Sequence, residues 1–276
     1  MTSQADISTL KEMARHIRED ILLQIFEAGS GHPGGSMSCV ELLAVLYGHV
    51  IKPSGDWIRR NSRDHVILSK GHAAPALYGV LAETGLIPKE ELKTLRQLGS
   101  RLQGHPDRTR LPEVEMSTGS LGQGLSVALG LALALTYREE PHHSYAILGD
   151  GEMDSGQVWE AILFAGAHKV DRLVAIIDAN GIQNDGPVED ILNIKPYAPK
   201  LVATGWAVTE IDGHDLKAVV DAVDWARSEL PGAKPRMIVA NTKKGAGVSF
   251  MTGRVDWHSH ALTEEQYRQA MSEVQA

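Results

Sequence analysis

Two short apolar runs that end in glycine and polar residues constrain the fold of this chain more than any other sequence feature. The first covers residues 145–148 and stops at a Gly-Asp-Gly turn centred on Asp150, and the second covers residues 173–177 and stops just before Asn180. Continuous apolar runs of this length are typical of strands buried on both faces of a sheet. Because a helix is predicted between them at residues 155–168, the two strands should be parallel.

This strand-helix-strand unit would bring two oxygen-bearing side chains to one edge of the sheet. Loops that follow parallel strands meet at the carboxyl edge, so Asp150 and Asn180 could contact the same cation. A hard ion such as Mg2+ or Ca2+ prefers oxygen ligands, and the ligands still lacking suggest a diphosphate. A helix that begins beside Gly151 would favour that anion through its N–H groups. Each motif alone is an ordinary turn, but on consecutive strands the pair predicts a metal and diphosphate site.

The rest of the chain repeats the alternation of strands and helices. Strands are predicted to begin near residues 65, 145, 173, 206 and 236, with helical patterns between them. At 276 residues and 29.9 kDa the chain is long enough for one large core. We therefore expect an α/β fold with a three-layer, doubly wound, mostly parallel sheet, formed by a single domain over residues 1–276.

Composition argues against several classes of function. A net charge of −8 and a pI near 5.8 are unlike a nucleic-acid-binding surface. The longest apolar stretch, residues 127–135, is too short to span a bilayer, and the first ten residues lack the features of a signal peptide. We expect a cytoplasmic protein that binds neither nucleic acid nor membrane. The single cysteine, Cys39, allows no internal disulfide, and its apolar helical surroundings predict a core position.

Histidines recur in the loops that follow the predicted strands and helices. His32, His72, His105 and His258 each lie beside a glycine, a proline or an aromatic residue. Each of them alone is more often structural than functional. Because histidine titrates near working pH, the four together predict a pocket that handles protons.

The ordered motifs of the chain resemble those of transketolase. Residues 149–182 are similar to the diphosphate-binding signature of thiamine diphosphate enzymes, and other motifs follow the transketolase order and spacing: Gly31-His32-Pro33-Gly34, Ser69-Lys70-Gly71-His72, Gly104-His105-Pro106, Thr118-Gly119-Ser120-Leu121-Gly122-Gln123-Gly124 and Trp257-His258. The resemblance covers the whole chain, but only the amino-terminal, diphosphate-binding domain of that family. It implies thiamine diphosphate and Mg2+ as cofactors, and transfer of a ketol unit between sugars or sugar phosphates.

The resemblance also implies roles for individual residues. The implied metal ligands are Asp150, the side chain of Asn180 and the carbonyl of Ile182. The implied cofactor contacts are His72, Gly119, Leu121, Gly151, Glu152, Asn180, Lys244 and His258. Among these, Gly119 would receive the aminopyrimidine amino group, and Leu121 would lie against the rings. The residues implied to face the sugar hydroxyls and to move protons are His32, His105 and His258.

One of the implied cofactor contacts has an alternative interpretation. Lys244 fits a diphosphate contact but could equally be an exposed lysine. Glu160 aligns with a family glutamate credited with coupling the two sites of a dimer, and it is the fourth residue to which we assign a catalytic role. Ser155 replaces a second such glutamate, which puts the relay between the sites in question.

The resemblance further implies that the glutamate that activates the cofactor is not part of this chain. In the family that residue belongs to a separate pyrimidine-binding domain. We therefore predict one subunit of a split transketolase, inactive alone, whose partner supplies the pyrimidine-binding and C-terminal domains in an α2β2 assembly. Two alternatives stay open: the α subunit of a 2-oxoacid dehydrogenase, and a non-catalytic cofactor-binding module.

Overall fold

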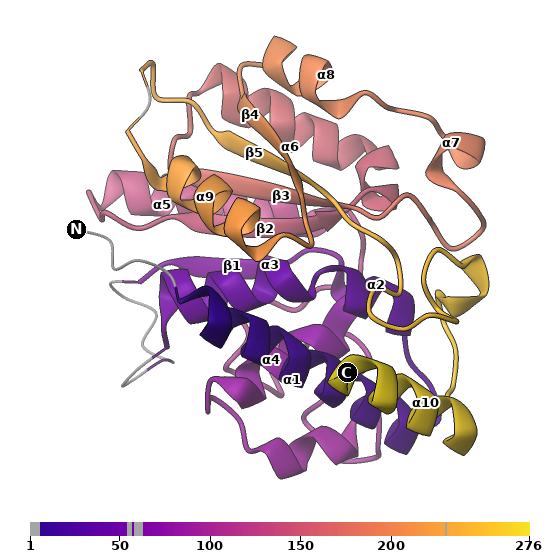
Figure 1. Ribbon diagram of the computed structural model, residues 1–276. Helices are drawn as coiled ribbons and strands as arrows, with labels where there is room; N and C mark the ends of the chain where they lie inside the picture. The colour runs from indigo at the N-terminus through magenta and orange to yellow at the C-terminus, as the bar shows by residue number, and fades with distance from the viewer. Residues whose placement is uncertain (1–5, 54–56, 58–62, 230) are drawn as a thin grey trace.

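A parallel sheet forms the centre of the molecule. The computed structural model describes residues 6–53, 57, 63–229 and 231–276. Its strands are ordered β1-β2-β3-β5-β4, all parallel (Figure 1). Their bounds are β1 (His65–Leu68), β2 (Ser144–Gly149), β3 (Leu173–Ala179), β4 (Ala207–Asp212) and β5 (Arg236–Asn241). The five predicted strands and the α/β fold with a parallel sheet are confirmed.

Helices cover both faces of this sheet (Figure 1). One face packs against α5 (Gln123–Tyr137), α6 (Gly156–Ala167) and α8 (Tyr197–Ala203). The core of the other face contains α1 (Ile7–Ala28), α3 (Val40–Val45), α4 (Ala74–Glu83) and α9 (Leu216–Arg227), and α10 (Glu264–Gln275) packs on α1. Two short helices, α2 (Pro33–Ser38) and α7 (Val188–Ile191), complete the set.

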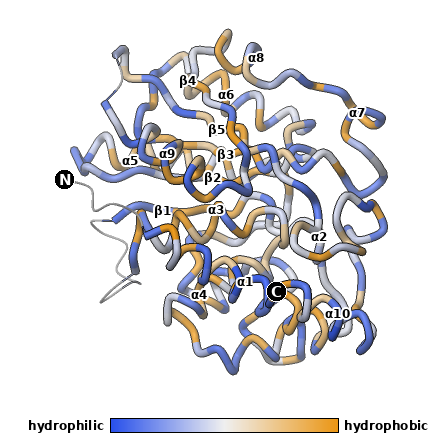
Figure 2. The backbone as a smooth tube through the Cα atoms, viewed as in Figure 1, coloured by the Kyte–Doolittle hydropathy of each residue, from blue (hydrophilic) through white to orange (hydrophobic). Residues whose placement is uncertain are grey.

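The strand sequences explain why the sheet needs two covering layers. Successive side chains of β2 alternate between the layers: Tyr145 and Ile147 belong to the core with α1, whereas Ala146 and Leu148 belong to the core with α5 and α6. A strand that is apolar on both faces is stable only when both are covered. Figure 2 shows the same result, with hydrophobic residues concentrated in the strands and hydrophilic residues along the outer loops.

The sequence patterns of residues 37–47 and 88–98 each predict one regular helix, and the structure differs at both. The helix expected at residues 37–47 is broken at Cys39 (φ −102°, ψ 14°) into α2 and α3, and continues as the π-helical turn Leu46–Ile51. Next to the break, the Ser38 hydroxyl donates hydrogen bonds to the carbonyl of Gly35 and to Asp178 of the sheet, and such bonds of a serine compete with a regular helix. The helix expected at residues 88–98 is a 3-10 helix, Lys89–Thr94, because only Leu92 and Leu95 in it reach the core.

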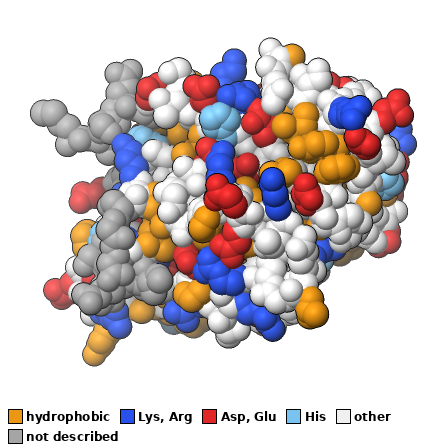
Figure 3. Space-filling view, turned by 90° about the horizontal axis from the view of Figure 1, so that it is seen from below, with side chains coloured by type: hydrophobic (Ala, Val, Ile, Leu, Met, Phe, Trp, Pro, Cys, Tyr) orange, Lys and Arg blue, Asp and Glu red, His pale blue; other side chains and the backbone are white. Residues whose placement is uncertain are grey.

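The surface of the molecule carries charges of both signs. Figure 3 shows acidic and basic side chains interspersed over the face seen from below. Cys39 is fully buried, as predicted, and burial raises the pKa of its thiol to about 12. In the described part of the chain, every helix is too short or too polar to cross a bilayer.

Candidate active site at the carboxyl edge of the sheet

A cavity of about 340 Å3 lies at the carboxyl ends of the strands. Most of the residues with predicted roles line it: His32, His72, Leu121, Asp150, Gly151, Glu152, Asn180, Ile182, Lys244 and His258. They come from seven separate segments, four of which follow β1, β2, β3 and β5 at the carboxyl edge of the sheet. His105 lies in ring contact with His72, and Gly119 faces the His105 ring, so both are close to the cavity wall. Glu160, in contrast, is exposed on α6 and does not line this cavity.

The predicted metal ligands converge from β2 and β3. Asp150 is 2% exposed, and its two carboxylate oxygens accept hydrogen bonds from Gly151 N–H at 2.9 Å and Gly181 N–H at 2.5 Å. Burial raises the pKa of Asp150 to about 6, although these hydrogen bonds oppose the shift. Asn180 Oδ1 accepts a hydrogen bond from Ile182 N–H at 3.1 Å, which closes a tight turn after β3. The arrangement presents a carboxylate, an amide and backbone carbonyls at one place.

A divalent cation at this place would depend on those amide and carbonyl oxygens. Nowhere in the residues that the structure describes do three His, Cys, Asp or Glu side chains gather as a metal-binding group. A single carboxylate with neutral oxygens and phosphate oxygens is a ligand set suited to a hard ion. The donor set therefore fits a cation that is bound together with a phosphorylated ligand.

Lys244 is buried against the same turn. It is 1% exposed, so the alternative of an exposed lysine is wrong. Its ammonium donates hydrogen bonds to the carbonyls of Ile182 at 3.2 Å and Gln183 at 2.9 Å, and lies 2.8 Å from Nδ1 of His258. Burial, reinforced by the charge of Lys70, lowers the pKa of Lys244 to about 8. A buried ammonium with only neutral partners provides a positive charge next to the predicted diphosphate position.

The helix predicted at residues 155–168 is confirmed as α6, but its N-terminus does not lie beside Gly151 as expected. Gly151–Asp154 is one 3-10 turn, and α6 begins only at Gly156. The cause is Glu152, which folds back so that its carboxylate accepts hydrogen bonds from Gly149 N–H at 3.1 Å, Gly122 N–H at 2.8 Å and the Ser69 hydroxyl. The N–H groups predicted to bind an anion beside Gly151 are thus those of a short turn, and Glu152 connects three loops of the site.

Four histidine rings form the other wall of the site. The ring centroids of His32 and His72 are 4.9 Å apart, those of His72 and His105 are 4.6 Å apart, and those of His32 and His258 are 5.6 Å apart. Burial lowers the pKa of His32 to about 3, and those of His72 and His258 to about 4, with neighbouring histidines and cations adding to the shift. Burial also lowers the pKa of His105. The cluster is therefore neutral at pH 7.

The structure adds residues to which the sequence gave no role. Lys70 and Asp178 form a buried ion pair under the cavity, and Asp178 also accepts hydrogen bonds from the hydroxyls of Ser38 (2.6 Å) and Thr242. Both residues belong to motifs that the sequence singled out, Ser69-Lys70-Gly71-His72 and the strand before Asn180. Their pairing could not be predicted, because 108 positions separate them.

Close backbone packing positions the loop that carries Gly119 and Leu121. A side chain at Gly71 would collide with the backbone at Gly119, and one at Gly124 would collide with Ser69. These glycines allow the loop before α5 to lie directly on the turn after β1. Leu121 remains 40% exposed at the cavity, which suits an apolar contact with a bound ring or a partner.

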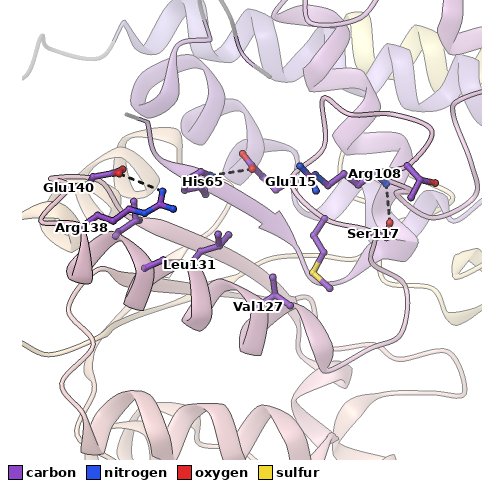
Figure 4. Close-up of a pocket in the computed structure, with 12 residues that line it drawn as sticks. His65, Arg108, Glu115, Ser117, Val127, Leu131, Arg138 and Glu140 are labelled. Atoms are coloured by element: carbon purple, nitrogen blue, oxygen red, sulfur yellow. Dashed lines mark hydrogen bonds and ion pairs between the residues drawn. The ribbon is translucent and has the colours of Figure 1, made fainter. Parts of the chain in front are cut away.

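A second cavity of about 640 Å3 lies away from this site, between α5 and the segment before it (Figure 4). It contains His65, the first residue of β1, and therefore lies toward the amino edge of the sheet. Its polar groups pair with one another: His65 lies 3.2 Å from Glu115, and Arg138 lies 3.8 Å from Glu140. The carboxyl-edge cavity, on which most of the predicted site residues converge, is the better candidate for chemistry.

Comparison with known proteins gives a consistent result. Residues 9–274 match the family described as transketolase, thiamine diphosphate binding domain. The chain is 43% identical over 266 residues to the 6-deoxy-6-sulfo-D-fructose transketolase subunit SqwG of Clostridium sp. (strain MSTE9), and the match covers 96% of each chain. It is 40% identical over 266 residues to one of the subunits of the apulose-4-phosphate transketolase of Actinobacillus succinogenes, covering 96% of this chain and 95% of that one.

Longer relatives match over part of their length. Human transketolase is 36% identical, with 98% of this chain and 43% of the human protein covered. The crystal structure of transketolase from Campylobacter jejuni superposes with a TM-score of 0.89 at 31% identity, and it covers 98% of this chain and 43% of that one. The chain thus corresponds to less than half of these longer proteins.

Proposed function

Because this chain belongs to the family of transketolase thiamine diphosphate-binding domains, we propose that it is one subunit of a two-chain transketolase. The enzyme would transfer a two-carbon ketol unit from a ketose to an aldose acceptor. The observation that carries this proposal is the convergence of Asp150, Asn180 and four neutral histidines on one cavity at the sheet edge. A metal-diphosphate site beside a wall of histidines suits a cofactor-bound, hydroxylated substrate.

The residues present fit thiamine diphosphate. The diphosphate would lie beside Gly151, His72, Lys244 and His258, and Mg2+ or Ca2+ would be held by Asp150, Asn180 and the Ile182 carbonyl. Nε2 of His105 is buried without a hydrogen-bond partner among the described residues, which supports a missing ligand on that side. Leu121 presents an exposed apolar side chain for the rings, and Gly119 has no side chain between the loop and the His105 ring. When bound, the cofactor supplies the electron sink for cleavage of a carbon-carbon bond.

The side chains of this chain would bind the sugar and handle its protons. Neutral imidazoles can donate or accept one hydrogen bond at each nitrogen, so His32, His105 and His258 can contact sugar hydroxyls without repelling one another. Burial lowers the pKa of each of them, which keeps the cluster neutral. His72 and Lys244 would instead neutralise the diphosphate.

A partner subunit is the second part of the proposal. The relatives from Clostridium and Actinobacillus are named as transketolase subunits of about this length. Apolar side chains on α5 and α6 are exposed in this chain, namely Leu133, Leu163 and Phe164, which suits burial against another subunit. We propose an α2β2 assembly in the cytoplasm, with the catalytic glutamate and the grip on the distal end of the sugar in the partner.

The substrate is proposed only as a class. The named relatives act on a sulfonated fructose and on apulose 4-phosphate, which share a ketose group and an anionic distal end. We propose a ketose of this kind as donor.

The unit that binds the cofactor is proposed to be a single domain over residues 1–276.

Reconstitution tests the proposal. The chain would be used to capture its partner from the native extract, and ketol transfer would be assayed with thiamine diphosphate and Mg2+, with and without the captured protein. Activity only in the presence of a partner with a pyrimidine-binding domain is the expected result. Full activity of the chain alone would refute the split enzyme. Release of carbon dioxide from a 2-oxoacid by the pair would instead identify the dehydrogenase alternative, and failure of the pair to bind the cofactor would identify a non-catalytic module.

A further inference from the structure

Arg96 joins two of the loops that carry the histidines. It follows the 3-10 helix Lys89–Thr94 and has a left-handed backbone (φ 60°), and its N–H donates a hydrogen bond to Leu102 O at 2.9 Å. Its guanidinium donates to the hydroxyl of Ser30 at 3.2 Å and lies 3.2 Å from Nδ1 of His32. The same group packs on Gly104, where an added Cβ would lie 2.9 Å from Nε of Arg96. It therefore holds the loop of His32 against the loop of His105.

The guanidinium has no acidic partner in the described ranges of the chain. Arg101, five positions later, pairs with Glu91 at 2.7 Å and Glu113 at 3.1 Å, but no described carboxylate lies within ion-pair distance of Arg96. The side chain is only partly exposed. A cation that is kept without a counterion beside a predicted catalytic residue suggests that its donors serve that residue.

The contact determines which nitrogen of His32 carries the proton. A guanidinium has five N–H donors and no acceptor, and it does not lose its proton in proteins. Nδ1 of His32 can face it at 3.2 Å only as an acceptor, so the proton of the neutral ring lies on Nε2. We propose that Arg96 is a positioning residue that fixes His32 as the Nε2–H tautomer, so that His32 donates a hydrogen bond to a substrate oxygen and does not accept a proton from it.

The surroundings of His32 agree with this role. The rings of His72, His105 and His258 lie 4.9, 6.1 and 5.6 Å from its ring, and the cations Lys70 and Lys244 lie behind them. The one acidic group that acts on this cluster from the loop of residues 181–186, Asp185, acts on His258. Burial, with His72 and Arg96 next, lowers the pKa of His32 to about 3. A positive charge on His32 is thus disfavoured from every side.

The assignment of the proton to Nε2 of His32 does not depend on the reaction, whereas the contact with substrate rests on the proposed function. The assignment reduces the number of side chains that could accept a proton from the sugar. His32 can orient and polarise a sugar oxygen, but a step that removes a hydroxyl proton must use another group, such as the unpartnered Nε2 of His105.

Nitrogen NMR of the full chain tests the assignment directly. The chain is labelled with 15N in its imidazole rings, and His32 is identified by comparison with His32→Gln. At pH 7 to 8 the wild-type His32 is expected to show a protonated Nε2 and an unprotonated Nδ1. A protonated Nδ1 in the wild type would overturn the proposal, whatever the variants do.

Variants separate positioning from folding. Arg96→Met should give a mixture of tautomers at His32 and a pKa closer to the ordinary value of about 6.5, and Arg96→Lys should restore the unprotonated Nδ1. Arg101→Met, a matched loss of an arginine that does not touch a histidine, should leave the His32 signals unchanged. Unchanged His32 signals in Arg96→Met would also overturn the proposal.

Kinetics of the assembled enzyme distinguish this inference from the proposed function. Arg96→Met is expected to lower kcat about 10-fold while the affinity for thiamine diphosphate stays within twofold of wild type, because Arg96 does not line the cavity. If the assembly transfers no ketol unit at all, the proposed function fails, and the tautomer is still decided by NMR. A loss of cofactor affinity equal to the loss of kcat would contradict the positioning role.

Discussion

Asp150 and Asp178 are buried carboxylates at neighbouring strand ends, and they are held in opposite ways. Asp178 is paired with Lys70 and accepts two hydroxyl hydrogen bonds. Although burial opposes it, the Lys70 charge keeps the pKa of Asp178 below its ordinary value. Asp150 accepts only backbone N–H groups, and burial raises its pKa to about 6. One carboxylate has its charge compensated by a lysine of the chain, and the other is the proposed ligand of a divalent cation.

This difference suggests that Asp178 belongs to the structural framework and Asp150 to the candidate site. Burying a charge is costly unless it is paired, so a buried carboxylate without a cation is retained for a reason other than stability. Asp178 links β3 to α2 and β5 through Ser38 and Thr242, and it supports the floor of the cavity. Asp150 bonds only to backbone N–H groups of the turns after β2 and β3, which fits its proposed role as a metal ligand.

The largest effect is expected from removing the charge of Asp178, the carboxylate that is paired with Lys70. Asp178→Asn leaves the Lys70 ammonium buried without its counterion, and should lower the free energy of unfolding by about 3–5 kcal/mol. Asp150→Asn removes a charge that no cation compensates, so its loss should stay below about 2 kcal/mol. Urea unfolding of the chain without cofactor measures both. Equal losses would remove the distinction between the two carboxylates.

The same comparison applies to the histidines of the site. Unlike Asp178, they are kept neutral instead of being paired with an opposite charge. The pKa values of His72 and His258 are lowered to about 4 by burial and neighbouring charges, from an ordinary value of 6.5. The contribution of these two histidines to the free energy of unfolding is complete above about pH 6.5. It falls as the pH drops toward 4, because the unfolded chain then binds protons that the folded chain does not.

Unfolding of the cofactor-free chain across that pH range checks this expectation. His72→Gln should reduce the fall in the free energy of unfolding between pH 6.5 and 4. His168→Gln, which changes an exposed histidine at the end of α6, serves as the control and should leave the fall unchanged. The same pH dependence in wild type and His72→Gln would show that His72 does not contribute.

The smallest effect on the chain itself is expected at Glu160. This residue is exposed on α6, so Glu160→Gln should change the free energy of unfolding by no more than about 0.5 kcal/mol. Cofactor affinity should also be retained, since Glu160 does not line the cavity. If Glu160 couples two sites of the assembly, only turnover of the assembled enzyme should fall. Normal turnover would contradict the role assigned to it.

The two halves of the site differed in how far the sequence could predict them. Asp150 and Asn180 lie in one strand-helix-strand unit, so local patterns and the rule for parallel strands were enough to bring them together. The pairing of Lys70 with Asp178, and of Arg96 with His32, joins segments far apart in the chain and leaves no periodic signal. Strands β1, β2, β3 and β5 were predictable because they contain continuous apolar runs, whereas β4, at an edge of the sheet, includes Thr209 and Glu210.

The local errors have physical causes of the same kind. At the helix break beside Cys39 and at the 3-10 turn after Asp150, Ser38 and Glu152 make hydrogen bonds to distant segments. Such contacts outweigh helix propensity, and a sequence pattern does not contain them. Burial of Lys244 likewise depends on the turn after Asn180, which the residues around Lys244 do not indicate.

The central claim is that Asp150 is the carboxylate through which a divalent cation holds thiamine diphosphate. Calorimetric titration of the cofactor into the chain assembled with its partner tests it, with Mg2+ or with a chelator, for wild type and Asp150→Ala. We expect either chelation or the substitution to weaken binding by more than about 100-fold, with no further loss when both are applied. Binding that is equally tight in Asp150→Ala, or in wild type without a divalent ion, would contradict the account.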